Sequence, residues 1–233
     1  PVFPLAWKES MGYREAGYMP GAVINFLALL GWNPGTEEEL FELEDLVALF
    51  ELERVQKSGA RFDPEKTKWF NQQYLQKANN SSLLEGFKSQ ILLSYPDVEA
   101  ALVSDISLLK IIDMVKERAV FAADLVSLSS FLFQAPDSYE EKAVKKQWKE
   151  QSPNILKDVL KLISNEKDFK GPSLEAAVKG YISDQELSFG TVMPPLRLAL
   201  VGALSGPNIF DIMEVIGAPE SQKRLKKIIE TLA

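Results

Sequence analysis

The residues of this sequence that can take part in chemistry are acidic and basic side chains, because its 233 residues include neither histidine nor cysteine. These absences remove the commonest general base, the commonest metal ligand, a thiolate zinc site and any cysteine nucleophile. Neighbouring acids at 37–39 and 140–141 are better explained as helix caps and solvated faces than as acid–base pairs. No glycine-rich segment ends in the Lys-Ser/Thr of a phosphate loop. The chemistry that remains is binding, and a self-contained enzyme is not predicted.

Arg197 is the strongest single candidate for a binding residue. It directly follows a Pro-Pro-Leu run at 194–196. A guanidinium can stack on an unpaired base and donate two parallel hydrogen bonds to a base edge or a phosphate. The alternative is an arginine at a helix start that pairs with a local carboxylate such as Glu186.

A Gly-Pro-Asn-Ile segment shortly afterwards is a second candidate. Its residues are Gly206, Pro207, Asn208 and Ile209. They precede an expected helix over 209–216, and main-chain groups near a helix N-terminus can hydrogen-bond base edges or a phosphate. An ordinary turn with an N-terminal cap is the alternative.

Basic side chains gather in two stretches. The first contains Arg54, Lys57, Arg61, Lys66 and Lys68. The second contains Lys223, Arg224, Lys226 and Lys227. The second stretch could form a phosphate patch. Its alternative is a solvated helix end that complements the helix dipole, and the first stretch is consistent with ordinary surface charge.

The elements that must hold these residues are helices. Apolar residues recur at three- and four-residue spacing at 22–30, 108–115, 155–163 and 225–232. Pro20 suits a helix start and Gly31 a helix end. Further starts are expected at Thr36, at Leu43 and at Asp63, where Asp63 would be the N-cap and Pro64 the first residue. Trp69 and Tyr74 are expected in the core.

Strand signals are missing, so the predicted fold class is all-α. Polar breaks at 79–82 and 134–138 divide the sequence. We therefore expect three helical subdomains, at about 1–80, 81–137 and 138–233. No apolar run approaches the roughly 20 residues that span a bilayer, so no membrane partner is predicted.

The net charge of −7 argues against a general affinity for nucleic acid. The charge is uneven, however, with a balance of −6 over residues 1–110 and −1 over 111–233. Reading a few unpaired bases needs only a local basic patch. The lack of cysteine fits the reducing cytoplasm. Because the sequence opens at Pro1 without a leader, we expect a piece of a longer protein.

Four segments in order resemble bacterial-type glutamyl-tRNA synthetases of class I. The first is 11–32, with Tyr-Arg-Glu-Ala-Gly-Tyr-Met-Pro at 13–20 and Leu-Gly-Trp at 30–32. The second is 50–69, the third is Lys-Glu-Arg-Ala at 116–119, and the fourth is 195–210. The ATP-site signatures of this family, His-Ile-Gly-His and Lys-Met-Ser-Lys-Ser, are absent.

The resemblance implies a stem-contact domain over 1–80 followed by two helix-cage anticodon-binding subdomains. It assigns Arg197 and the 206–209 segment to the anticodon site, and offers Arg118 as a further anticodon contact, with a salt bridge to Asp113 or Glu117 as its alternative. It implies tRNA backbone contacts for the 54–68 stretch. The implied partner is glutamate tRNA, with no DNA, and the chain is expected to be a monomer.

By the same resemblance, the parent ligase uses ATP and Mg²⁺, whereas this piece binds no cofactor or metal and is expected to be inactive alone. The competing hypothesis is a helical protein–protein interaction scaffold without an RNA role, which the negative net charge favours. Binding of tRNA at low salt separates the two.

Overall fold

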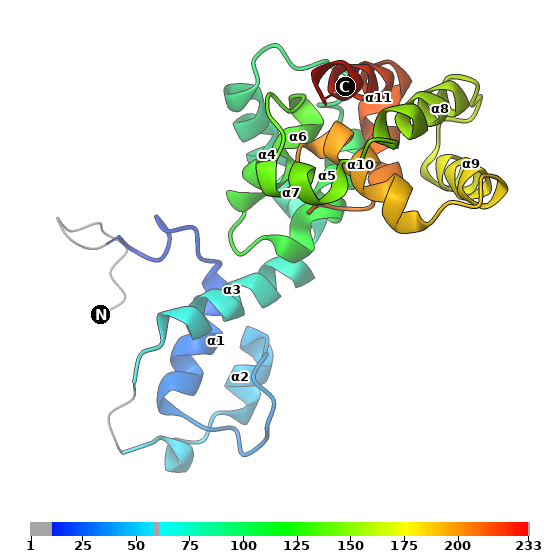
Figure 1. The fold of residues 1–233 in the computed structure, drawn as a ribbon. Helices are drawn as coiled ribbons and strands as arrows, with labels where there is room; N and C mark the ends of the chain where they lie inside the picture. Colours follow the sequence, from blue (N-terminus) through cyan, green and yellow to red (C-terminus); the bar gives the residue numbers. More distant parts are fainter. Residues whose placement is uncertain (1–10, 58–60, 233) are drawn as a thin grey trace. The chain divides into compact units, whose positions relative to one another are not determined.

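The computed structural model describes residues 11–57 and 61–232. Within these ranges lie eleven α-helices and two short 3-10 helices, and the sole β pairing is an isolated antiparallel bridge between Trp32 and Val55 (Figure 1). The predicted all-α class is confirmed. The chain divides into two compact units. The first holds the chain up to Phe87 together with Lys116–Ser127, and the second holds Lys88–Val115 and everything from Leu128 onward.

The first unit is built on three helices. They are α1 (Pro20–Gly31), α2 (Leu43–Leu49) and α3 (Pro64–Lys77), with the 3-10 helices η1 (Leu52–Arg54) and η2 (Lys116–Arg118) beside them. Helix α1 packs against α2 and α3, and η2 packs against α3. Ala22, Phe26 and Phe70 form the centre of this core. The carboxamide of the buried Asn25 accepts the Phe41 amide at 2.9 Å and the Tyr74 hydroxyl at 3.0 Å, which fixes the segment ahead of α2.

Local sequence explains where these helices begin. Asp63 accepts the amides of Glu65 and Lys66 at 2.9 and 3.3 Å, and Pro64 is the first helical residue, so the predicted start of α3 is confirmed. Pro20 likewise begins α1. The start of a helix at Thr36 is wrong, because residues 35–40 are bends and irregular chain.

Trp69 is the second correction in this unit. The buried stripe of α3 is Thr67, Phe70, Asn71 and Leu75. Phe70 is fully buried, whereas Trp69 is 38% exposed and touches it edge-on at 5.0 Å between ring centroids. The buried residues of α3 therefore follow the helical spacing that includes Phe70, and Trp69 lies beside that buried stripe.

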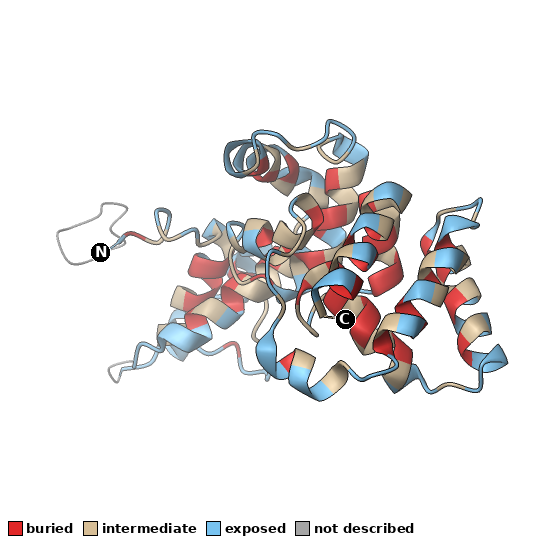
Figure 2. Ribbon diagram, turned by 45° about the horizontal axis from the view of Figure 1, so that its top comes forward, coloured by how far each residue is buried: buried red, intermediate tan, exposed pale blue. Residues whose placement is uncertain are grey.

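The second unit is a bundle of helices. It holds the second half of α4 (Asn80–Ser94), α5 (Asp105–Val115), most of α6 (Asp124–Phe133), α7 (Glu141–Gln147), α8 (Ser152–Ser164), α9 (Gly171–Asp184), α10 (Phe189–Val201) and α11 (Ile209–Leu232). Helix α11 packs against α8, α9 and α10. Figure 2 shows the buried residues as stripes along the helices. The predicted stripes at 108–115, 155–163 and 225–232 are buried except for Leu109, Leu160 and Leu232, which are partly exposed.

Two helices of this unit are interrupted. Pro194 and Pro195 lie inside α10, where they remove two backbone donors from the helix ladder. Gly217 is non-helical, with φ 78° and ψ 170°, so α11 consists of two helical segments. The predicted helix over 209–216 and the predicted final helix are these two segments. None of the helices within the described ranges combines the length and hydrophobicity that crossing a bilayer requires.

Candidate nucleic-acid interface

Arg197 and the segment at 206–207 lie together in the second unit. Arg197 is half-buried in the last turns of α10, and its Nη1 donates a hydrogen bond of 2.8 Å to the carbonyl oxygen of Pro207. Gly206 has φ +144°, and a Cβ built there would lie 3.2 Å from the same Nη1. Arg197 is therefore not at a helix start. Its guanidinium contacts the loop that joins α10 to α11.

The other two residues of this segment begin α11. The Asn208 side chain accepts the Phe210 amide at 2.9 Å and so caps the helix. Pro207 and Ile209 are buried, whereas Asn208 is exposed. The loop is thus anchored in the core on both sides of an exposed cap. Main-chain groups at this helix N-terminus carry partial positive charge that favours an acceptor or an anion.

Arg118 lies in the first unit, on the exposed side of η2. Its neighbours in the Lys-Glu-Arg-Ala segment have structural contacts. The Lys116 ammonium donates to the carbonyl of Ala78 at 2.8 Å and to Asn80 at 2.6 Å. The Glu117 carbonyl accepts side-chain amides of α3 at 2.8 and 3.2 Å, and Ala119 is fully buried. The segment therefore clamps the C-terminal end of α3 and presents Arg118 at the surface.

The basic stretch of the first unit is partly engaged. Arg54 donates to the Pro34 carbonyl and pairs with Glu51 at 2.7 Å. Lys66 pairs with Glu39 and stands 6.0 Å from the centre of the Phe70 ring. Lys57 and Arg61 are exposed. Arg54 is therefore held in place by local contacts, and the stretch is no continuous row of solvated cations.

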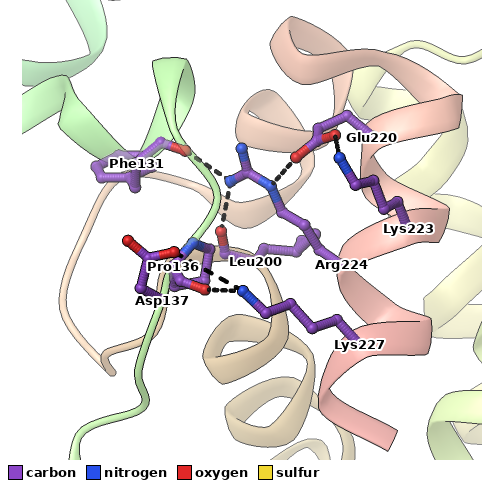
Figure 3. Close-up of polar contacts among 8 residues, drawn as sticks. All are labelled: Phe131, Pro136, Asp137, Leu200, Glu220, Lys223, Arg224 and Lys227. Atoms are coloured by element: carbon purple, nitrogen blue, oxygen red, sulfur yellow. Dashed lines mark hydrogen bonds and ion pairs between the residues drawn. The ribbon is translucent and has the colours of Figure 1, made fainter. Parts of the chain in front are cut away.

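The C-terminal basic stretch also divides into different environments, as Figure 3 shows. Arg224 is only 2% exposed, and its Nε and Nη1 donate three hydrogen bonds inside the second unit. Lys227 donates to the carbonyl of Pro136 at 2.8 Å. Lys223 is exposed and lies 3.7 Å from Glu220. The candidate phosphate patch is thus corrected for Arg224, which is an interior residue and cannot reach a phosphate.

Glu214 is an electrostatic centre that sequence reasoning missed. On the first segment of α11, it accepts Lys110 at 2.8 Å, Lys170 at 3.3 Å and the Gly171 amide at 2.7 Å. The hydrogen bond from Lys110 is the main cause that lowers the pKa of Glu214 to about 2. Partial burial raises this pKa, and the bond from the Gly171 amide lowers it further. Its three partners are 104, 44 and 43 residues away in sequence, so no local pattern reveals the site.

Acid clusters of the kind that hold metals are missing from the described ranges, where no group of three or more acidic side chains is arranged to bind an ion. What the described side chains offer is a guanidinium beside a helix N-terminus in one unit, and exposed arginines and lysines in the other. Taken separately, each of these basic groups can hydrogen-bond a phosphate or a base edge.

Comparisons with known proteins agree with this chemistry. The family model described as an anticodon binding domain matches residues 64–229. A second model, described as the catalytic domain of class I tRNA synthetases (E and Q), matches residues 5–69.

Similar curated proteins are glutamate–tRNA ligases. That of Flavobacterium johnsoniae is 48% identical over 236 residues, which cover 100% of this chain and 46% of that protein. That of Porphyromonas gingivalis W83 is 44% identical with the same coverage. A crystal structure of the glutamate tRNA ligase of Elizabethkingia meningosepticum in complex with its amino acid is 43% identical, with a TM-score of 0.91 over 100% of this chain and 46% of that one. The chain spans about half the length of the relatives that it matches.

Proposed function

Because the chain belongs to the anticodon-binding domain family, we propose that it is the tRNA-reading part of a glutamate–tRNA ligase. Its substrate in this role is glutamate tRNA, whose anticodon bases it binds after they leave their stack. The glutamate–tRNA ligases with 40–48% identity over the whole chain support this proposal. We expect the protein to act in the cytoplasm as a monomer, without binding DNA.

The single observation that carries the proposal is the contact of Arg197 with the 206–209 loop. The Nη1 of Arg197 donates to the Pro207 carbonyl, which holds the guanidinium beside the start of α11. A guanidinium carries five N–H donors in a fixed planar fork, the geometry that matches a base edge or a phosphate. An exposed asparagine cap next to it adds a polar group that can donate or accept.

We also propose a division of labour along the chain. The stem-contact role belongs to residues 1–80, with backbone contacts from Arg54, Lys57, Arg61 and Lys66, and anticodon reading belongs to 81–137 and 138–233. Arg118 and the two lysines at 223 and 227 are the remaining proposed RNA contacts. Activation of glutamate with ATP and Mg²⁺ would belong to a part of the ligase that this chain does not include.

The test is binding of glutamate tRNA to the 233-residue chain, measured by fluorescence anisotropy at low and moderate salt. We expect binding that depends on the anticodon sequence and weakens with salt. The Arg197→Glu variant should bind more weakly with a smaller salt slope, whereas reversing the charge of Lys179, which pairs with Glu175 on α9, should leave the anticodon dependence intact. No binding at low salt would favour the protein–protein scaffold, and robust pyrophosphate exchange by this chain alone would overturn its role as a non-catalytic part.

A further inference from the structure

Arg224 is a buried arginine that the proposed RNA site does not use directly. It lies on the second segment of α11, and its hydrogen bonds to Glu220, Phe131 and Leu200 reach three elements (Figure 3). Its Nε donates to Glu220 one turn earlier at 2.8 Å. Its Nη1 donates to the carbonyl of Phe131 at 2.6 Å and to that of Leu200 at 2.8 Å.

Both carbonyls belong to the ends of helices. Phe131 is in the last turn of α6 and Leu200 in the last turn of α10. The last four carbonyls of a helix have no partner within it and carry partial negative charge. A single guanidinium therefore satisfies two helix ends at once. Glu220, whose side chain is 30% exposed, supplies the countercharge that a buried cation needs.

The helix end that Arg224 holds is the one that carries Arg197. Leu200 lies three residues after Arg197, and both are in the C-terminal part of α10. Two residues later, Gly202 ends the helix with φ +81°, and its carbonyl accepts the Glu140 amide at 2.8 Å. The chain then turns through Gly206 to Pro207, where it meets the Arg197 guanidinium again.

The last turns of α10 are therefore held at two points. Arg197 donates to the Pro207 carbonyl, two residues before α11 begins. Further along the chain, Arg224 of α11 donates to the Leu200 carbonyl inside the bundle. The spacing between α10 and the start of α11 determines where the Arg197 guanidinium can lie, because that guanidinium bridges the two.

We propose that Arg224 is the positioning residue of the anticodon site. It fixes the C-terminal turn of α10 against α11, so that Arg197 and the 206–209 loop keep the geometry that discriminates between bases. This inference rests on the proposed function. Lys227, one turn further, assists by holding the Pro136 carbonyl in the loop that packs against Gly202.

The experiment measures discrimination, the ratio of the dissociation constants for two RNA hairpins. One is the anticodon stem-loop of glutamate tRNA, and the other has one anticodon base replaced. Partial unfolding weakens both affinities by the same factor, the folded fraction, and leaves their ratio unchanged. If Arg224 only stabilised the fold, its replacement would therefore leave discrimination unchanged. If its replacement displaces Arg197, discrimination will fall.

We expect Arg224→Met to lower the discrimination about tenfold, the change that accompanies the loss of one well-placed base contact. Arg224→Lys keeps the positive charge and should restore part of it. The matched control is Lys161→Met, which removes an exposed charge from α8 in the same unit, where Lys161 pairs with Asp158 one turn earlier at 3.0 Å. Its ratio should equal that of the unaltered chain.

An unchanged ratio in Arg224→Met would overturn the proposal. If that variant does not fold, Glu220→Gln decides together with Arg224→Lys, because Glu220 is accessible and orients the Arg224 Nε. Ratios equal to that of the unaltered chain in both would then overturn the proposal. If the unaltered chain itself does not distinguish the two hairpins, the proposed function fails, and this outcome is separate from a failure of the role of Arg224.

Discussion

At Glu214, one carboxylate meets donors from two other helices and the residue before one of them. It stands on the first segment of α11, directly after the loop that holds Arg197, and it is 18% exposed. Charged hydrogen bonds in a partly buried site are stronger than those on the surface. Glu214 therefore anchors the start of α11 to α5 and α9.

We predict that Glu214→Gln lowers the free energy of unfolding by about 2 kcal/mol at neutral pH. The pKa of Glu214 in the folded chain, about 2, lies below its ordinary value of 4.5. Its contribution is therefore complete above pH 4.5 and is lost as pH falls from 4.5 toward 2. Urea unfolding of both proteins between pH 7 and pH 3 should show the difference shrinking. Glu175→Gln on α9, which removes an exposed pair with Lys179, is the control and should cost little at any pH. A pH-independent difference would contradict the ionic origin.

Arg197 allows a second prediction at this scale, which separates charge from shape. Arg197→Lys keeps the charge but loses the planar fork that donates parallel hydrogen bonds. Affinity for the correct anticodon should fall about tenfold while affinity for a substituted anticodon stays nearly constant. Titration of the two hairpins at one salt concentration measures both. Equal losses for both would mean that Arg197 contacts phosphate.

At the scale of the element, the junction between α10 and α11 depends on the glycine that ends α10. Gly202 has φ +81°, and a Cβ there would lie 2.8 Å from Pro136 and 2.9 Å from the Ser138 carbonyl oxygen. A side chain at this position meets both an unfavourable backbone conformation and the neighbouring main chain.

We predict that Gly202→Ala lowers the free energy of unfolding by about 2–4 kcal/mol, because a left-handed alanine and a backbone clash both contribute. The matched control is Gly180→Ala inside α9, where nothing lies within 4 Å of the added methyl. That change should stabilise the chain by about 0.5–1 kcal/mol, since alanine favours a helix. Urea denaturation measures both. A Gly202→Ala variant as stable as the unaltered chain would show that the loop can move away.

Helix positions were predictable from sequence because periodicity and caps are local. The stripe at 155–163 and the cap at Asp63 both determine structure within a few residues. The environment of Arg224 was not predictable, because its partners are carbonyls 93 and 24 residues away. Main-chain carbonyls carry no sequence signal at all. Arg197 itself was a candidate from sequence. Its contact with Pro207 was not predictable, because the acceptor is again a main-chain carbonyl.

At the scale of the molecule, the net charge of −7 would oppose binding to a polyanion if the charge were spread evenly over the surface. Binding depends instead on the charge near the contact. In the described ranges the acids already pair with many of the bases, as at Glu39 with Lys66 and at Glu214 with Lys110. The charges left to meet RNA are local.

We therefore predict a shallow salt dependence for tRNA binding. The slope of log affinity against log salt should correspond to no more than the six basic side chains proposed to contact the RNA backbone, at about 0.7 to 0.9 per contact. Anisotropy titrations between 50 and 200 mM salt, a range suited to this measurement, supply the slope. A steeper slope would require phosphate contacts from basic side chains outside that set.

The first unit is not continuous in sequence, since its residues 116–127 come after 28 residues that belong to the other unit. During synthesis, α1 to α3 leave the ribosome well before the segment whose Lys116, Glu117 and Val120 make hydrogen bonds to the α3–α4 region. In the nascent chain, the η2 side of α3 therefore stays uncovered until residues 116–120 have also emerged. Completion of the first unit is in this way tied to the translation of Lys88–Val115, which belongs to the other unit.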